Sequence, residues 1–198
     1  MESSKTGCGL VLASQSPRRR MLMEDAGMKF DVVPPHIDEP SNLANGLPPR
    51  QYAESLSYFK ARSVKELMPN SVVLGADTIA VAGGEVLGKP SDQDDARRML
   101  SDLSASRHQV ITGITLLGNR GRIITSDVTY VTMREITPEE MDDYIESGEW
   151  RDKAGAYAIQ ETADRFVVAI AGSFSNIVGL PIELTQLALK ELMQHERI

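Results

Sequence analysis

Hydroxyl and guanidinium groups are concentrated in residues 12–20, whose sequence is LASQSPRRR. Ser14 and Ser16 carry hydroxyls that can donate hydrogen bonds, and Arg18 and Arg19 carry planar guanidinium groups that bind oxyanions through paired hydrogen bonds. All four side chains fall within one short stretch. The chemistry that they offer together is the recognition of phosphate oxygens.

The elements expected around this stretch support the same chemistry. The apolar run 9–13 predicts a buried strand, residues 14–17 a turn, and residues 21–23 followed by Gly27 a short helix closed by a glycine. The N–H groups at a helix start lack backbone acceptors and attract anions. The pattern therefore predicts a phosphate site, although a capped helix with a solvated basic first turn fits the same residues.

Carboxylates occur at two further places where a ligand could reach them. Asp77 and Thr78 end the apolar run 71–78, and Glu39 lies in the acidic, proline-rich loop 34–40. A buried carboxylate is costly without a partner, and ligands of open α/β sheets bind beyond strand ends. The alternatives are that Asp77 caps a turn and that Glu39 is a solvated surface group.

Three more cations, each from a different segment, complete a set suited to a polyanion: Lys60, Lys89 and Lys153. Cations and carboxylates together fit a triphosphate with a metal ion, because Mg²⁺ binds one or two carboxylates plus substrate phosphates. Asp77 and Glu39 would hold the metal, and Asp77 could also activate water. The bland alternative is that the lysines lie on the surface.

Strands and helices alternate along the rest of the chain, which predicts an α/β fold. We expect a long amphipathic helix over 50–68 and a helix that starts near Thr137 with a capping box and stops near Gly148. In the middle of the chain we expect a hairpin of 79–81 with 85–87, a helix capped by Ser91 with Asp94, and a hairpin of 109–117 with 122–134. Toward the C-terminus we expect a binding loop over 150–160 and a last strand over 166–170. A helix opened by Pro181 should follow, with Ile182, Leu187 and Leu192 facing inward.

Composition narrows the function classes. The 198 residues allow one domain over 1–198, and the formal charge of −7 argues against a nucleic-acid partner. No apolar run is long enough to span a membrane, and the first residues do not resemble a signal peptide, so we expect a soluble cytoplasmic protein. The single cysteine, Cys8, and the spacing of His36, His108 and His195 give no metal-ligand pattern.

Several stretches resemble the Maf nucleoside triphosphate pyrophosphatases, over nearly the whole chain: ASQSPRR at 13–19, GADT at 75–78, LGKP at 87–90, KAGAYAIQ at 153–160 and NIVGLP at 176–181. The resemblance implies an elongated mixed sheet with flanking helices and a cleft between two lobes, as in inosine triphosphate pyrophosphatase. It also implies a divalent metal (Mg²⁺, Mn²⁺ or Co²⁺), a homodimer, and hydrolysis of a nucleoside triphosphate to monophosphate and pyrophosphate in nucleotide-pool housecleaning.

The residue roles that follow are those of the resemblance. The KAGAY loop ending in Ile-Gln is similar to the subgroup that acts on dTTP and UTP. Asp77 becomes the proton acceptor, and Arg18, Thr78 and Gln160 select the substrate. The other matching cleft positions are Arg19, Lys60, Lys89, Lys153 and Glu39.

Three positions depart from the family pattern. Trp150 stands where proline is usual, and Ala158 and Glu161 stand where glycines are common. Alanine adopts a positive φ less freely than glycine, so these residues bear on the conformation of the loop.

Two rival function classes remain. A non-catalytic nucleotide-binding regulator, which the resemblance links to cell division and septum formation, would need the phosphate site without an activated water. A kinase or phosphatase is disfavoured, because the chain has no GxxxxGK[ST] loop and no histidine or cysteine nucleophile signature.

Overall fold

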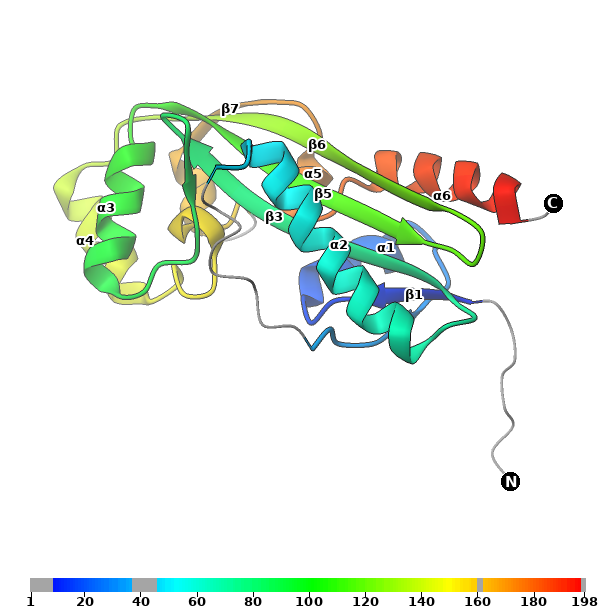
Figure 1. Cartoon of the computed structure of the whole chain (residues 1–198). Helices are drawn as coiled ribbons and strands as arrows, with labels where there is room; N and C mark the ends of the chain where they lie inside the picture. Colours follow the sequence, from blue (N-terminus) through cyan, green and yellow to red (C-terminus); the bar gives the residue numbers. More distant parts are fainter. Residues whose placement is uncertain (1–8, 37–45, 160–161, 197–198) are drawn as a thin grey trace.

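The computed structural model describes residues 9–36, 46–159 and 162–196. Within them the chain forms an α/β fold around one mixed sheet in the order β2-β1-β3-β5-β6-β7, with β4 paired to β3 (Figure 1). The predicted fold class is confirmed. The strands are β1 Leu10–Ala13, β2 Asp31–Val32, β3 Val72–Ala82, β4 Glu85–Leu87, β5 Arg107–Leu117, β6 Arg122–Met133 and β7 Val167–Ala171.

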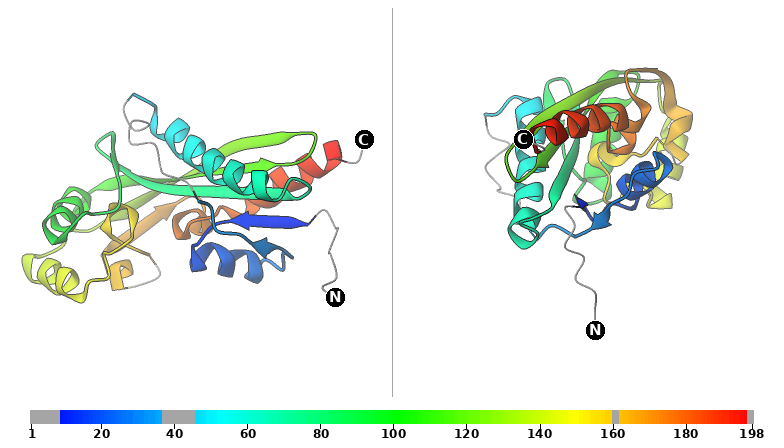
Figure 2. Two further views of the ribbon diagram at one scale, coloured as in Figure 1. Left: turned by 60° about the horizontal axis from the view of Figure 1, so that its bottom comes forward. Right: turned by 90° about the vertical axis from the view of Figure 1, so that its right-hand side faces the viewer.

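Helices cover both faces of the sheet, as the views of Figure 2 show. One face is covered by α2 (Pro49–Leu67), and the other carries α1, α3, α4, α5 and α6. The bounds of these helices and of two short 3₁₀ helices are α1 Pro17–Asp25, α3 Gln93–Leu103, α4 Pro138–Ser147, η1 Ala154–Ala156, η2 Thr162–Phe166, α5 Phe174–Val178 and α6 Ile182–Glu196.

Two large hydrophobic clusters lie on the face opposite α2. One packs α3 and α4 against one end of the sheet, and the other packs α1 and α6 against β1 and the first half of β3. The two clusters give the molecule its elongated shape with helices gathered at both ends (Figure 1). Because one sheet runs through both clusters, the prediction of a single domain over 1–198 remains reasonable and stays a prediction.

The strand that carries Asp77 differs from the prediction. We expected a strand ending at Thr78 and a separate hairpin strand over 79–81, but β3 is continuous from Val72 to Ala82. The reason is that β5 pairs with β3 along residues 73–81 without interruption, which leaves no place for a turn at Thr78. Asp77 therefore lies in the middle of its strand and not at the carboxyl end.

On the edge of β3 away from β5, the pairing with neighbouring strands is interrupted, and this gap replaces the predicted strand end as the place where a ligand could bind. The parallel strand β1 stops at Ala13, opposite Gly75, and the antiparallel strand β4 stops at Leu87, opposite Ala80. The carboxyl ends of β1 and β4 thus face each other across residues 76–79 of β3. Ligands bind beyond the carboxyl ends of strands in open sheets, and here two such ends converge on one stretch.

Several local predictions are confirmed. Gly27 follows α1 with a φ of 68°, the left-handed conformation that glycine adopts without steric cost. Thr137 and Glu140 form the capping box of α4, and Gly148 ends that helix with a φ of 71°. The hairpin of β5 and β6 and the pairing of β3 with β4 also occur as expected.

Three local predictions are wrong. The cap of α3 is Asp92, which accepts a hydrogen bond from the Asp95 N–H at 2.8 Å, while Ser91 donates to the Asp95 carboxylate from outside the helix. Leu187 is 64% exposed, because α6 contacts the sheet through Ala188 and Leu192. The last strand begins one residue later than expected, since Phe166 belongs to η2.

No helix among residues 9–36, 46–159 and 162–196 has both the length and the apolar composition that crossing a bilayer requires.

Candidate active site

The turn that was predicted to bind phosphate is held together by hydrogen bonds to its own hydroxyls, and its binding of phosphate stays a prediction. Ser14, which is buried, accepts a hydrogen bond from the Ser16 N–H at 3.1 Å. Ser16 is the N-cap of α1 and accepts from the Arg19 N–H at 3.5 Å, with Pro17 at the first helical position. These serines use their oxygens to shape the turn, and their hydroxyl protons remain to be donated to an anion.

Arg19 joins three segments that are far apart in the sequence. Its Nε donates to the Gly179 carbonyl at 2.8 Å, its Nη2 to Thr78 Oγ1 at 3.1 Å and its Nη1 to Ser14 Oγ at 3.4 Å. Burial lowers the pKa of the Arg19 guanidinium, the charge of Asp77 opposes this shift, and that of Arg18 adds to it. The guanidinium therefore connects the turn after β1, the middle of β3 and the loop before α6.

A second set of hydrogen bonds holds Thr78 from behind. Thr78 Oγ1 lies 2.9 Å from Thr112 Oγ1 of β5, and Thr112 donates to the carbonyl of Asn176 at 3.0 Å. The Asn176 amide donates to the carbonyl of Val110 and to Thr129 Oγ1. Asn176 and Gly179 belong to the NIVGLP stretch, so its place in the site is to support Arg19 and Thr78.

On the opposite face of β3, Asp77 forms an ion pair with Lys60 of α2. The two side chains are 11% and 16% exposed, so most of the pair is removed from solvent. A nearly buried carboxylate needs such a partner, because an unpaired charge in this environment is costly. The structure thus brings together two of the predicted site residues.

Two glycines let α2 approach close enough to make this ion pair. A Cβ on Gly75 would lie 2.3 Å from the Ser57 carbonyl oxygen, and a Cβ on Gly113 would lie 2.3 Å from that of Ala53. No larger residue fits at either position without moving the helix. Gly75 of the GADT stretch therefore has a structural role, which is to bring the helix that carries Lys60 next to Asp77.

The site consequently has two sides. Neighbouring residues of a strand point to opposite faces of the sheet, so Asp77 faces α2 while Thr78 faces α1 and α5. The residues predicted to form one cluster are divided between these faces. Between the ends of β1 and β4, no described strand pairs with this edge of β3, so a ligand at this gap would lie next to both faces.

The lysines at the β4 side of the gap have other contacts. Lys89 follows β4 and lies 3.8 Å from the Asp152 carboxylate, with both side chains mostly exposed. Lys153 donates to the carbonyl of Glu149. Arg18 is half-buried on the first turn of α1. The roles predicted for Lys89, Lys153 and Arg18 stay predictions.

The described part of the predicted binding loop, residues 150–159, is anchored in the core. Gly155, with a φ of 69°, donates its N–H to the Gly88 carbonyl at 3.0 Å, and a Cβ there would lie 2.9 Å from Ala80. Tyr157 places its hydroxyl 2.7 Å from Nε2 of the buried His108. Burial lowers the pKa of His108 to about 4 and raises that of Tyr157. The loop is thereby attached to β3, β4 and β5.

The departures from the family pattern are accommodated where the structure describes them. Trp150 is buried and donates its indole N–H to the Ile145 carbonyl at 3.0 Å, which helps to close α4. Ala158 is not among the residues with a positive φ, so it needs no glycine-like conformation. Glu161, together with the predicted site residues Glu39 and Gln160, lies outside the described residues.

Asp77 was predicted to bind a metal ion, which stays a prediction, and the structure allows one contact of that kind. One carboxylate oxygen of Asp77 faces Lys60, which leaves the other for a cation. In the part of the chain that the structure describes, no three His, Cys, Asp or Glu side chains form a metal cluster. Mg²⁺ commonly binds one or two protein carboxylates together with substrate phosphates, so a single available oxygen of Asp77 is compatible with it.

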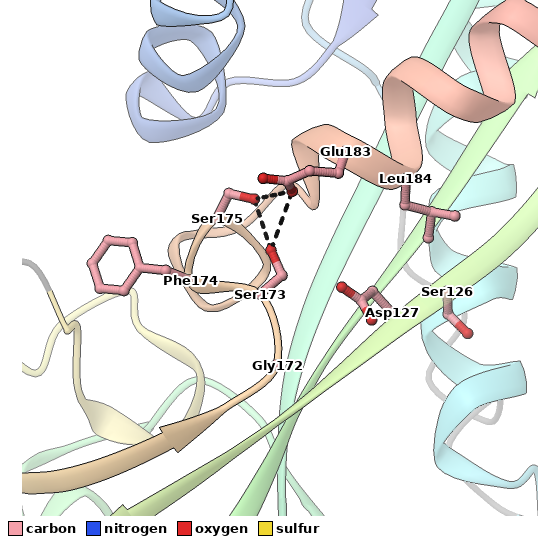
Figure 3. Close-up of a pocket in the computed structure, with 8 residues that line it drawn as sticks. All are labelled: Ser126, Asp127, Gly172, Ser173, Phe174, Ser175, Glu183 and Leu184. Atoms are coloured by element: carbon pink, nitrogen blue, oxygen red, sulfur yellow. Dashed lines mark hydrogen bonds between the residues drawn. The ribbon is translucent and has the colours of Figure 1, made fainter.

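A cavity of about 780 Å³ lies elsewhere, between β6, α5 and α6. Figure 3 shows Ser173 and Ser175 hydrogen-bonded to Glu183, with Asp127 across the cavity. Ser173 also caps α5 by accepting from the Asn176 N–H at 3.3 Å. Because two carboxylates line this cavity, it is a poor site for a triphosphate, and its residues support the helix that carries Asn176.

The geometry defines an α/β protein in which serine hydroxyls and a buried arginine lie beside a gap in the sheet. Comparison with known families agrees: the Maf-like protein family matches residues 9–192, and the chain belongs to this family. A dTTP/UTP pyrophosphatase of Koribacter versatilis is 49% identical over 176 residues, which are 89% of this chain and 90% of that protein. A dTTP/UTP pyrophosphatase of Geobacillus sp. is 42% identical over 183 residues, covering 92% and 97% of the two chains.

Sequence reasoning missed Thr112 and gave no separate role to Asn176 and Gly179. Thr112 lies in a strand whose residues are mostly buried, and nothing in the sequence distinguishes it from a core threonine. Asn176 and Gly179 are part of a recognisable stretch, but their contacts with Thr112 and Arg19 depend on long-range folding.

Proposed function

We propose that the protein hydrolyses dTTP and UTP to the nucleoside monophosphate and pyrophosphate, in nucleotide-pool housecleaning in the cytoplasm. The observation that carries this proposal is the position of Arg19, which links Ser14, Thr78 and Gly179 next to the strand residue Asp77. Oxyanion donors and a carboxylate beside one gap are the groups that hydrolysis of a phosphoanhydride requires. The relatives named dTTP/UTP pyrophosphatases support the choice of substrate.

The phosphates would bind on the turn after β1. Ser14 and Ser16 donate their hydroxyl protons, and Arg19 has two N–H bonds beyond the three that it uses within the described structure. Arg18 and Lys89 add charge from either side of the gap. These cations stabilise the negative charge that develops on the pyrophosphate leaving group.

Asp77 would act on the attacking water. Its carboxylate accepts the proton as the water oxygen bonds to the α-phosphorus and the bond from that phosphorus to the bridging oxygen breaks. The electron pair leaves with pyrophosphate, and the proton passes from Asp77 to solvent. Lys60 holds the carboxylate in one orientation through their ion pair.

A divalent metal, Mg²⁺, Mn²⁺ or Co²⁺, would be held by Asp77 and Glu39 together with phosphate oxygens. When bound, it would supply charge neutralisation at the phosphates. The one oxygen of Asp77 that does not face Lys60 suits this arrangement.

Gln160 would read the base, with Arg18 and Thr78 contributing to substrate selection. Uracil and thymine present two carbonyls that flank an N–H group, and a side-chain amide offers both a donor and an acceptor to this edge. Replacing Gln160 by glutamate should lower the use of dTTP and UTP relative to CTP. An equal fall for all pyrimidine triphosphates would remove Gln160 from base recognition.

We also propose that the protein forms a homodimer through the edge strand β7. All five residues of β7 are apolar, four of them are exposed, and Val168 is 60% exposed. An exposed edge strand without charges presents backbone groups that pair readily with another strand. Two copies of β7 in antiparallel pairing would satisfy these groups and cover the apolar side chains.

A screen of nucleoside triphosphates with identification of both products tests the main proposal. Release of pyrophosphate with a monophosphate from dTTP and UTP supports it. Binding of dTTP without any product would instead identify the regulator that the sequence left open as the alternative.

A further inference from the structure

The side chain of Thr112 is fully buried on β5, on the face of the sheet that carries Thr78. Its hydroxyl oxygen lies 2.9 Å from Thr78 Oγ1 and 3.0 Å from the carbonyl oxygen of Asn176. Within the described residues, Thr112 makes no hydrogen bond to the turn at residues 14–17 or to Asp77. Its importance for the site lies in how its single proton is used.

Two arrangements of the hydroxyl protons are open to these threonines. In the first, Thr112 donates to the carbonyl of Asn176 and accepts from Thr78. In the second, Thr112 donates to Thr78, which then donates to the carbonyl of Gly179 at 3.4 Å. A hydroxyl carries one proton, so the two arrangements exclude each other.

The distances favour the first arrangement. It uses contacts of 2.9 and 3.0 Å, whereas the second needs the contact of 3.4 Å, beyond the usual range for two oxygens. The Gly179 carbonyl already accepts from Arg19 Nε at 2.8 Å and gains little from Thr78. The hydrogen bonds therefore run in one direction, from Arg19 Nη2 to Thr78, from Thr78 to Thr112, and from Thr112 to Asn176.

We propose that Thr112 is a positioning residue of the hydrolytic site, which accepts the hydrogen bond of the Thr78 hydroxyl and so leaves the lone pairs of the Thr78 oxygen for Arg19. The guanidinium is then held at Gly179 and at Thr78, and its unused N–H bonds point in fixed directions. This inference rests on the proposed function for its effect on catalysis.

One consequence concerns what the site offers to a substrate. The Thr78 hydroxyl donates its one hydrogen bond to Thr112, so Thr78 can accept a hydrogen bond from a ligand N–H or O–H but has none left to donate to a phosphate oxygen. Ser14 has the opposite hydrogen-bonding role. Its oxygen accepts hydrogen bonds from Ser16 and Arg19, and its hydroxyl hydrogen can be donated to a ligand. The two hydroxyls thus face different parts of a nucleotide, Ser14 the phosphates and Thr78 a donor group.

The decisive variants are Thr112→Val, which keeps the shape and removes the hydroxyl, and Thr112→Ser, which keeps the hydroxyl. Thr115→Val is the matched control, because Thr115 lies on the same strand, is equally buried, and bonds to Ser57 on the opposite face at 2.7 Å. We expect Thr112→Val to lower kcat/KM for dTTP by roughly 3- to 10-fold, mainly through KM, since one hydrogen bond of modest net worth is lost. Thr112→Ser should restore most of the loss.

A measurement without substrate separates this inference from the proposed function. The Arg19 Nε–H signal in ¹⁵N NMR, assigned by its disappearance in Arg19→Lys, reports how firmly the guanidinium is held. Thr112→Val should speed the solvent exchange of this proton several-fold relative to the parent, Thr112→Ser and Thr115→Val. If Thr112→Val does not fold, Thr112→Cys provides the test, because a thiol is a weak hydrogen-bonding group of similar size.

The outcomes are distinct. Faster exchange in Thr112→Val alone, together with a raised KM, supports the positioning role. The same exchange rate and the same KM in Thr112→Val and Thr115→Val overturn it. If the parent protein hydrolyses no nucleotide, the proposed function fails, and the exchange rates alone decide whether Thr112 positions Arg19.

Discussion

Arg19 Nη2 donates a hydrogen bond to Thr78 Oγ1 across 3.1 Å, joining the first helix to the middle of β3. The two residues are separated by 59 positions in the sequence. Through the same guanidinium the contact extends to the Gly179 carbonyl, so one side chain holds three recognised stretches together. Arg19 is thus as much a structural residue as a ligand for phosphate.

Replacing Arg19 by lysine should therefore damage both stability and activity. A single ammonium group cannot reach three acceptors in a fixed fork, so we expect kcat/KM for dTTP to fall roughly 100-fold and stability to fall by about 1–2 kcal/mol. Arg20→Lys is the matched control, because Arg20 is exposed and pairs only with Glu24 among the described residues. Equal kinetics and melting curves for both variants would contradict the role given to Arg19.

Substituting the two members of the Asp77–Lys60 ion pair should have different effects. Asp77→Asn should lower kcat by roughly 100-fold or more and leave the protein folded, because the amide keeps the shape but cannot take up a proton. Steady-state kinetics with circular dichroism measure both effects. Near-normal turnover would make Asp77 a purely structural residue.

Lys60→Met should instead cost stability, by about 3 kcal/mol, because it leaves the Asp77 carboxylate nearly buried without a partner. The double variant Lys60→Met with Asp77→Asn should recover part of this loss, since the uncompensated charge is gone. Denaturant unfolding of the three variants gives the coupling free energy. Simple additivity would show that the pair contributes little.

Stability should depend on pH through His108. Burial lowers the pKa of His108 to about 4 from the ordinary histidine value of 6.5, so between these values the unfolded chain binds a proton that the folded chain does not. Stability is therefore fully present above about pH 6.5 and falls as the pH drops toward 4, by about 3 kcal/mol in total.

Guanidinium unfolding at about pH 7 and about pH 5 measures this effect. His108→Gln should reduce the difference between the two conditions, and His36→Gln, at an exposed histidine, should leave it unchanged. An unaltered difference in His108→Gln would assign the pH dependence to other groups.

The proposed dimer places Val168 in the interface. Val168→Lys puts a charge on the edge strand, which opposes pairing with a second copy, so the mass measured by light scattering should change from about twice to about once the 21.7 kDa of the chain. Leu187→Lys is the control, since Leu187 is 64% exposed on α6. A parent protein of 21.7 kDa would show that no such dimer forms.

Local features of the site could be predicted from the sequence, because they depend on neighbouring residues. The turn at Ser14 and Ser16 and the capping box of Thr137 with Glu140 follow from short-range chemistry, whereas α1 begins at Pro17, which was predicted to belong to the turn. The motif pattern also led to the right family.

The predictions that were wrong concern features that depend on pairing between distant segments of the chain. Nothing local shows that β5 continues along β3 past Thr78, so the sequence placed Asp77 at a strand end. The gap that takes the place of this end exists because β1 and β4 both stop short on the same edge. The alternation of a strand then puts Asp77 and Thr78 on opposite faces, a consequence that requires the continuous strand.

Hydrolysis of dTTP in ¹⁸O-labelled water tests the central claim most directly, because the label marks the phosphorus that water attacks. The account predicts dTMP and pyrophosphate as products, with the label in dTMP. Label in pyrophosphate would mean attack at the β-phosphorus, and release of labelled orthophosphate with dTDP would mean attack at the γ-phosphorus. Either of these results would contradict the assignment of the site built around Asp77 and Arg19.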